Sequence, residues 1–148
     1  MQTLSVVIPA HNEADVIDRC LRRLDLDDAT AEIDIIVVAN GCTDDTADRA
    51  RSHAGVTVVE TETGSKAHAL RLGDDAARYW PRIYLDADVE VDISTLEALG
   101  RVLEEDGVEA ACPRLDVQLD NSDWAVRAYY DTWTVSYTHL TLPTTPYV

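Results

Sequence analysis

Short apolar runs that alternate with segments of helical periodicity constrain the fold of this chain more than any other feature. Continuous apolar runs are typical of strands that are buried on both faces of a sheet. Apolar residues spaced three or four apart are typical of helices that bury one side. The strand-like runs cover residues 4–8, 33–38, 56–59, 83–85 and 108–112. The helical segments cover residues 13–25, a stretch that begins after Thr43, residues 66–78 and residues 94–105.

This strand–helix order, repeated four times and followed by a final strand, predicts an α/β fold with a mainly parallel sheet flanked by helices. The chain has 148 residues, of which 46% are hydrophobic, so it is long enough for one domain with a core. Pro9 is expected to end the first strand. Thr43 is predicted to cap a helix, and Ser94 and Glu97 have the spacing of a capping box.

The charge of the chain limits its partners. It carries 28 acidic residues against 12 basic ones, a formal net charge of −16. Nucleic acid is therefore disfavoured, because phosphate backbones are bound by basic surfaces. A nucleotide can still bind, but only with local help from a metal ion or a helix N-terminus.

Cysteine placement and hydropathy bear on location. Cys20, Cys42 and Cys112 form no Cys-x-x-Cys pair, which disfavours a zinc site or a disulfide framework and favours a reducing cytosol. The N-terminus lacks the pattern of a signal peptide, and no apolar run approaches the ~20 residues of a membrane span. A cytoplasmic protein is expected, with a peripheral position at the inner membrane face left open.

Two carboxylates one residue apart, Asp86 and Asp88, directly follow the strand-like run 83–85. In an open α/β sheet, ligands bind just outside the carboxyl ends of the strands. Unpaired acids are costly there, but they suit a hard divalent cation, which takes oxygen ligands and often bridges to phosphate. We therefore predict that this pair holds a metal ion and a nucleotide diphosphate. Asp25 and Asp27 have the same spacing in an acidic loop, so the prediction depends on position in the chain.

Three further polar segments follow the earlier strands and offer groups that a nucleotide site can use. They are Pro9-Ala10-His11-Asn12-Glu13, Asn40-Gly41-Cys42-Thr43-Asp44-Asp45-Thr46 and Gly64-Ser65-Lys66-Ala67-His68-Ala69-Leu70. With Tyr84-Leu85-Asp86-Ala87-Asp88, they resemble in order and spacing the motifs of the N-terminal, donor-binding half of a family 2 glycosyltransferase with the GT-A fold. The resemblance covers residues 4–92 and depends on the whole set.

The resemblance implies a Rossmann-like GT-A fold and an inverting transfer of a sugar from a nucleotide diphosphate sugar to an acceptor, with Mn²⁺ or Mg²⁺. It names neither the sugar nor the acceptor. A nucleotidylyltransferase is disfavoured, because no Gly-rich loop follows the first strand. A dinucleotide-binding dehydrogenase is disfavoured because the Gly-x-Gly-x-x-Gly motif is absent there.

The first polar segment is assigned by the resemblance to the base and ribose of the donor. Pro9, Ala10, Asn12 and Glu13 would form the loop against these groups. His11 belongs to the same candidate site but is expected to pack or form hydrogen bonds, not to catalyse. A structural role is the alternative for Asn12, which could cap a helix.

Asn40 stands where the family usually has an Asp that accepts a hydrogen bond from the base. Asn keeps a carbonyl acceptor but adds a donor, so uracil, guanine and thymine all stay open. A turn role before Gly41 is the alternative. Lys66, the only lysine in the chain, begins a helix, where a positive side chain opposes the helix dipole. It is expected to contact the nucleotide, with a surface ion pair as the alternative.

Within the acidic motif, Asp88 is expected to bind the metal through its carboxylate. Asp86 would contact the ribose or share the metal through water, and Ala87 belongs to the same site. Glu90 and Asp92 either extend this acidic wall or are solvated. No residue is assigned as the catalytic base.

Three regions are predicted. Residues 1–113 form the nucleotide-sugar-binding half, and residues 114–135 begin the acceptor-binding region, with an edge strand at 114–119 and a helix at 124–133. Residues 136–148 contain no Asp, Glu, Lys or Arg, and we interpret them as a non-native tail on a truncated chain, with a natural polar tail as the alternative. A truncated nucleotide- and metal-binding module without turnover is therefore the alternative function.

Overall fold

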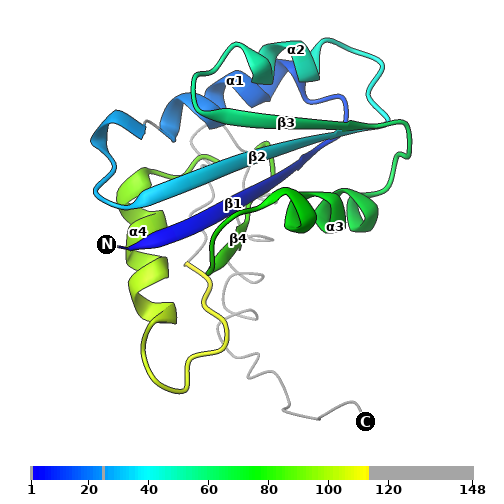
Figure 1. Ribbon diagram of the computed structural model, residues 1–148. Helices are drawn as coiled ribbons and strands as arrows, with labels where there is room; N and C mark the ends of the chain where they lie inside the picture. The colour runs from blue at the N-terminus through cyan, green and yellow to red at the C-terminus, as the bar shows by residue number, and fades with distance from the viewer. Residues whose placement is uncertain (1, 25, 114–148) are drawn as a thin grey trace, which may run out of the picture. The chain divides into compact units, whose positions relative to one another are not determined.

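The computed structural model describes residues 2–24 and 26–113, so the elements predicted beyond residue 113 lie outside the described residues. Four strands form one parallel sheet in the order β3-β2-β1-β4 (Figure 1). The strands are β1 (Thr3–Ala10), β2 (Glu32–Asn40), β3 (Val56–Thr61) and β4 (Arg82–Tyr84). The helices are α1 (Ala14–Arg23), α2 (Thr46–Arg51), α3 (Lys66–Ala76) and α4 (Ile93–Leu103), with a 3-10 helix η1 at Leu26–Asp28. The predicted α/β fold with a parallel sheet is confirmed.

The central strands β1 and β2 are buried on both faces, as their continuous apolar runs predict. Side chains alternate between the faces, so Val6 packs in one core cluster and Val7 in another. Pro9 does not end β1, which continues to Ala10. The reason is that β4 pairs with β1 only as far as Val7, so the ladder on that side needs no N–H from Pro9.

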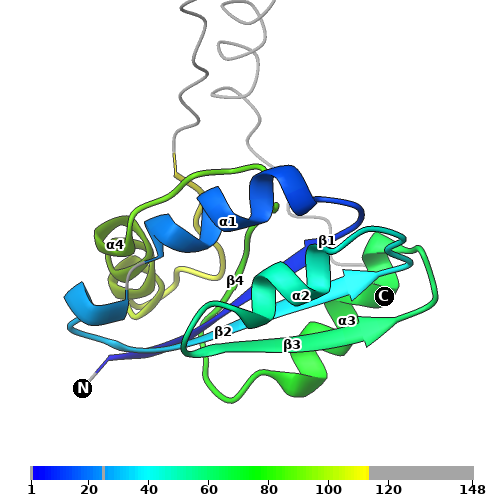
Figure 2. The same ribbon diagram turned by 90° about the horizontal axis from the view of Figure 1, so that it is seen from above.

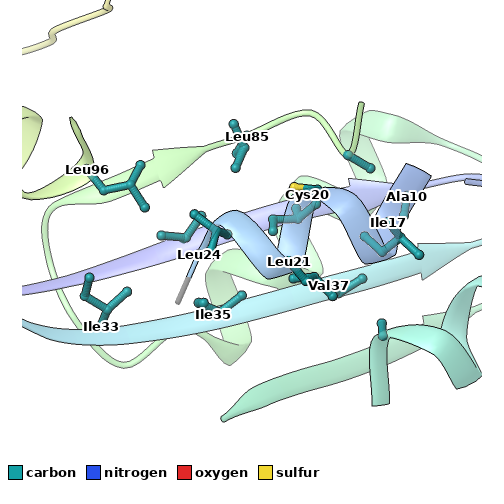
Figure 3. Close-up of a cluster of buried hydrophobic side chains, with 14 of the residues drawn as sticks. Ala10, Ile17, Cys20, Leu21, Leu24, Ile33, Ile35, Val37, Leu85 and Leu96 are labelled. Atoms are coloured by element: carbon teal, nitrogen blue, oxygen red, sulfur yellow. The ribbon is translucent and has the colours of Figure 1, made fainter. Parts of the chain in front are cut away.

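Helices cover both faces of the sheet (Figure 2). The helices α1, α2 and α4 contribute to the larger core cluster, in which Ile17 and Leu96 are fully buried (Figure 3). On the other face, Ala69 of α3 packs against β1 and β2. Gly73 permits this close approach, because a Cβ there would lie 2.2 Å from Cγ1 of Val7. No helix among residues 2–24 and 26–113 is long and apolar enough to cross a membrane.

The fifth strand predicted at residues 108–112 is wrong. No strand forms there, and residues 109–113 are exposed. The run contains Glu109 and two alanines, which have low strand propensity and bury little apolar surface. The apolar character of this run was therefore too weak to specify a strand.

Both predicted helix caps are also wrong. The N-cap of α2 is Asp45, not Thr43. The capping box fails because α4 begins at Ile93, one residue before the predicted start, and no side chain caps it. Glu97 instead accepts a hydrogen bond at 2.6 Å from the backbone N–H of Thr30, far away in the sequence.

A polar network lies near the amino ends of the strands and is called here the amino-end network. Asp34, which is 2% exposed, accepts hydrogen bonds from the backbone N–H of Arg78 at 2.9 Å and from its Nη2 at 3.0 Å. Ser5 Oγ accepts hydrogen bonds from the backbone N–H of Tyr79 at 2.9 Å and from Arg82 Nη1 at 3.2 Å. These contacts fix the turn between α3 and β4 on the sheet.

Candidate functional site

An open pocket of about 360 Å³, called here the strand-end pocket, lies at the carboxyl ends of β1, β2 and β4. It is lined by Pro9, His11, Glu13, Asn40, Gly64, Lys66, Asp86, Ala87 and Asp88. All the candidate residues predicted from the sequence line it, except Ala10 and Asn12. Its position is the one at which open α/β sheets bind ligands.

The two acids of the predicted metal pair follow β4 in a segment where burial alternates. Leu85 and Ala87 are buried in the core, whereas Asp86 and Asp88 are exposed. The chain turns here, with the Val89 N–H donating to the Asp86 carbonyl oxygen at 3.0 Å, and both carboxylates line the pocket while Leu85 and Ala87 are buried. The sequence spacing therefore produces one pair of solvent-accessible carboxylates at the pocket.

Lys66 reaches across the pocket to this pair. Its Nζ atom lies 2.5 Å from Asp86 Oδ1, and both side chains are more than half exposed. No ion pair joins Asp88 to any basic residue in the described part of the chain. Lys66 thus forms the surface ion pair that was the alternative to a nucleotide contact, but its partner is an acid of the candidate site itself.

The pocket lining carries three carboxylates, from Glu13, Asp86 and Asp88, and one ammonium group, from Lys66. A diphosphate alone would be repelled by this excess of negative charge. Across the described residues, no cluster of three or more His, Cys, Asp or Glu is placed to hold a metal ion. The oxygens of Asp86 and Asp88 match the preference of a hard divalent cation, but a ligand must complete its coordination.

Asn40 ends β2 and is 4% exposed. Its Nδ2 donates hydrogen bonds to the carbonyl oxygens of Ala10 at 2.9 Å and Val38 at 3.4 Å. The opposite amide orientation would set Oδ1 against two carbonyl oxygens, so this network fixes the orientation. Asn40 is therefore no left-handed turn residue, because the positive φ, +59°, belongs to Gly41.

His11 stands beside Asn40, and its Nδ1 lies 2.6 Å from the Asn40 carbonyl oxygen. This contact joins the loop after β1 to the end of β2, as expected for a hydrogen-bonding role. Ala10 is buried at the end of β1 and does not line the pocket. It contributes its carbonyl oxygen, which accepts hydrogen bonds from Asn40 Nδ2 and from Cys42 Sγ at 3.4 Å.

Asn12 does not line the pocket and does not cap α1. Its φ of 54° is positive, and its Oδ1 accepts a hydrogen bond from the backbone N–H of Thr43 at 2.8 Å. Asp44 instead accepts a hydrogen bond from the N–H of Ala14, in the first turn of α1, at 3.2 Å. Hydrogen bonds from Thr46 hold the pKa of the Asp44 carboxyl below its ordinary value. The loop after β2 therefore fixes the loop that carries Glu13.

Gly64 lines the pocket but was missing from the candidate residues. The structure shows why a glycine stands here: a Cβ on Gly41 would lie 2.8 Å from the Cα of Gly64. The Gly41 N–H also donates to the Thr61 carbonyl oxygen at 2.7 Å. Sequence alone does not show that these two loops touch.

Glu90 and Asp92 do not line the pocket. Glu90 pairs with Arg19 at 2.6 Å and with Arg23 at 3.1 Å, and Asp92 lies 3.6 Å from Arg23. These pairs tie the acidic segment to α1. Burial, with the nearby charges of Asp88 and Glu90, raises the pKa of the Cys20 thiol to about 11, as expected for a buried thiol that is not a nucleophile.

The parallel α/β sheet, with a polar pocket at its strand ends, defines a nucleotide-binding class of fold. The family model for glycosyl transferase family 2 matches residues 5–147. The chain therefore belongs to glycosyl transferase family 2. The match includes most of the segment 136–148, whose non-native origin stays a prediction.

Solved structures of this family resemble the chain. Glucosyl-3-phosphoglycerate synthase from Mycobacterium tuberculosis, in complex with UDP, is 28% identical, with a TM-score of 0.60 over 72% of this chain and 42% of that one. A mycobacterial protein is 31% identical, with a TM-score of 0.61, and the match covers 72% of this chain and 39% of that protein. TarS from S. aureus, 20% identical with a TM-score of 0.55 over 70% and 20%, shares the fold. The search of curated proteins finds no match. The chain thus spans less than half of these structures.

Proposed function

We propose that this chain is the donor-binding part of a glycosyltransferase that transfers a sugar from a nucleotide diphosphate sugar to an acceptor, with inversion and with Mn²⁺ or Mg²⁺. The observation that carries the proposal is the strand-end pocket, where an acidic pair, a lysine and a fixed amide come together. Family membership supports it, as do the UDP and Mn²⁺ in a complex of the related M. tuberculosis synthase.

The acidic pair fits a divalent cation. Asp88, which has no ion-pair partner within the described residues, would ligate it directly, and Asp86 would share it through water or contact the ribose. The diphosphate oxygens would complete the coordination, because the described protein groups do not. Such an ion, when bound, neutralises the negative charge that develops on the leaving nucleoside diphosphate.

Asn40 would recognise the base as a hydrogen-bond acceptor. Its Nδ2 donates to the backbone carbonyl oxygens of Ala10 and Val38, so Oδ1 is the amide atom left for a ligand. Oδ1 of Asn40 can accept a hydrogen bond from an N–H of the base, which is the role of the Asp that the family usually has at this position. Uracil, thymine and guanine all present one, whereas cytosine does not on its ring nitrogens.

The loop after β1 would hold the rest of the nucleoside. Pro9 and His11 form a wall beside Asn40, and the contact of His11 with the Asn40 carbonyl oxygen fixes the ring. Glu13 also lines the pocket, and its carboxylate can accept hydrogen bonds from ribose hydroxyls. Ala10, through its carbonyl oxygen, and Asn12, through its side-chain Oδ1, would hold this loop in place without contacting the nucleotide.

A module that binds nucleotide and metal without turnover is the second candidate. It is favoured by the described pocket lining, which offers no carboxylate beyond those proposed for the donor and its cation. Transfer requires a base that takes the proton from the acceptor hydroxyl. The carboxylates that line the described pocket are all assigned here to the donor or its cation.

The test is calorimetric titration of the chain with UDP, GDP and dTDP, each with Mn²⁺ and with EDTA. Mass spectrometry of mixtures with the matching nucleotide sugars then detects hydrolysis or transfer. Metal-dependent binding with turnover supports the transferase, and metal-dependent binding alone supports the module. The absence of any metal-dependent binding contradicts both.

A further inference from the structure

We propose that Lys66 takes the place of the cation at Asp86, and that cation binding moves it from this carboxylate to the phosphates of the nucleotide. The cation and the nucleotide then strengthen each other's binding through Lys66, in addition to their direct contact. This inference rests on the proposed function, because it concerns the same pocket.

The geometry of the ion pair carries the first step. Nζ of Lys66 lies 2.5 Å from Oδ1 of Asp86, so the ammonium occupies the space next to a carboxylate that a cation would approach. A divalent ion held by Asp88 and near Asp86 would repel this ammonium strongly at such a distance. The two positive groups therefore compete for one carboxylate.

The pair is also easy to separate. The side chains of Lys66 and Asp86 are 62% and 54% exposed, and exposed ion pairs contribute little to stability because water screens them. The ammonium sits on a flexible stem with three donors, which can adopt a new partner. The Asp34–Arg78 pair offers no such freedom, because Asp34 is only 3% exposed at its side chain.

The position of Lys66 favours phosphate as the new partner. It is the first residue of α3, beside backbone N–H groups at the positive end of the helix. Gly64, without a side chain, also lines this part of the pocket. Once the ion pair between Lys66 and Asp86 is broken, a phosphate group next to the start of α3 can take the place of the Asp86 carboxylate as the partner of the ammonium.

Linkage makes the prediction two-sided, because coupling between two ligands is reciprocal. In Lys66→Met, Mn²⁺ alone is expected to bind up to about fivefold more tightly than in the wild type, the factor for an exposed ion pair. UDP in the presence of Mn²⁺ is expected to bind several-fold more weakly. The factor by which Mn²⁺ and UDP enhance each other should fall.

The experiment titrates Mn²⁺ alone by electron paramagnetic resonance, and UDP with Mn²⁺ or EDTA by calorimetry, on the full chain. Arg71→Met is the matched control, because it removes one positive charge from an exposed position on the same helix outside the pocket. Comparison of Asp86→Asn with Asp88→Asn gives a second arm. Each variant removes one negative charge from the pocket, but only Asp86→Asn releases Lys66. Asp86→Asn should therefore bind UDP in EDTA more tightly than Asp88→Asn does.

Opposite shifts in Lys66→Met, with none in Arg71→Met, support the exchange. Wild-type affinity of Lys66→Met for Mn²⁺ alone overturns it, even if UDP binding weakens. Equal affinities of Asp86→Asn and Asp88→Asn for UDP in EDTA also overturn it. If wild type binds neither Mn²⁺ nor any of the three nucleotides, the proposed function fails as well, which is a different result from normal binding with unchanged coupling.

Discussion

The two ends of the parallel sheet use polar residues in opposite ways. In the amino-end network, Asp34 is buried and accepts two hydrogen bonds from Arg78, and Ser5 accepts two more. In the strand-end pocket, Asp86 and Asp88 are exposed, and only Asp86 is paired with Lys66 in the described part of the chain. The acid at the first end is buried with fixed partners, whereas the acids at the second end are exposed, and Asp88 has no ion-pair partner within the described residues.

This difference separates stability from binding. A buried carboxylate with fixed partners leaves them unsatisfied when it is removed, so its loss lowers the free energy of unfolding. An exposed carboxylate at a pocket contributes little to folding, so its loss affects the ligand. Substitutions at the two ends should therefore have effects that do not overlap.

The largest effect is expected for Asp34→Ala. It leaves the Arg78 N–H and guanidinium without their partner and should lower the free energy of unfolding by about 3 kcal/mol, measured by urea denaturation. Asp48→Ala is the matched control, because Asp48 is 83% exposed and pairs at the surface with Arg51. If both variants lose the same stability, the network does not have the structural role assigned to it.

Next in size is Asp88→Asn. It should weaken Mn²⁺-dependent UDP binding by more than about tenfold, the scale of a lost charged contact, and leave the thermal unfolding temperature unchanged. Calorimetry and thermal melts measure the two quantities. Asp92→Asn provides the comparison, since Asp92 lies in the same acidic segment but pairs with Arg23 outside the pocket. Wild-type UDP affinity in Asp88→Asn would refute the metal role.

The sequence predicted which residues gather at the carboxyl ends of the strands better than it predicted their hydrogen-bond partners. Apolar runs specify β1 and β2 through burial, and the positions of Asp86 after β4 and Lys66 at the start of α3 follow from chain order. Long-range partners do not follow, because nothing local to Glu97 indicates that Thr30 recruits its carboxylate. Gly64 was missed for the same reason: the contact of its loop with Gly41 is a tertiary property.

A smaller effect is expected for Asn40→Asp, which tests whether a residue of the strand-end pocket also serves the fold. Its Nδ2 donates to two backbone carbonyl oxygens, and a carboxylate oxygen would face them without a proton. We expect the free energy of unfolding to fall by about 1–2 kcal/mol, the cost of a lost buried hydrogen bond. Urea denaturation measures it. Unchanged stability would mean that Nδ2 does not hold the loop after β1.

The smallest effect concerns acid titration of Glu97 and Asp44, two carboxyls with a lowered pKa that lie near opposite ends of the sheet. Hydrogen bonds from Ala31 and Thr30 lower the pKa of Glu97 from 4.5, and those from Thr46 and Ala14 lower the pKa of Asp44 from 3.8. A carboxyl whose pKa is lower in the folded state than in the unfolded state stabilises the fold at pH values above its pKa in the unfolded state. This contribution is lost as the pH falls through its pKa in the folded state. The thermal unfolding temperature should therefore decrease as pH falls below about 4.5.

Glu97→Gln and Asp44→Asn should each reduce this pH dependence, since the group that titrates is gone. They differ in binding, because Glu97 contacts the segment before β2 whereas Asp44 holds the first turn of α1 next to Glu13. UDP affinity at pH 7 should fall about twofold to fivefold in Asp44→Asn, the effect of one exposed hydrogen bond, and stay unchanged in Glu97→Gln. Equal UDP affinities in the two variants would show that the loop after β2 does not position the loop after β1. Asp44 would then have a purely structural role, although it lies at the same end of the sheet as the strand-end pocket.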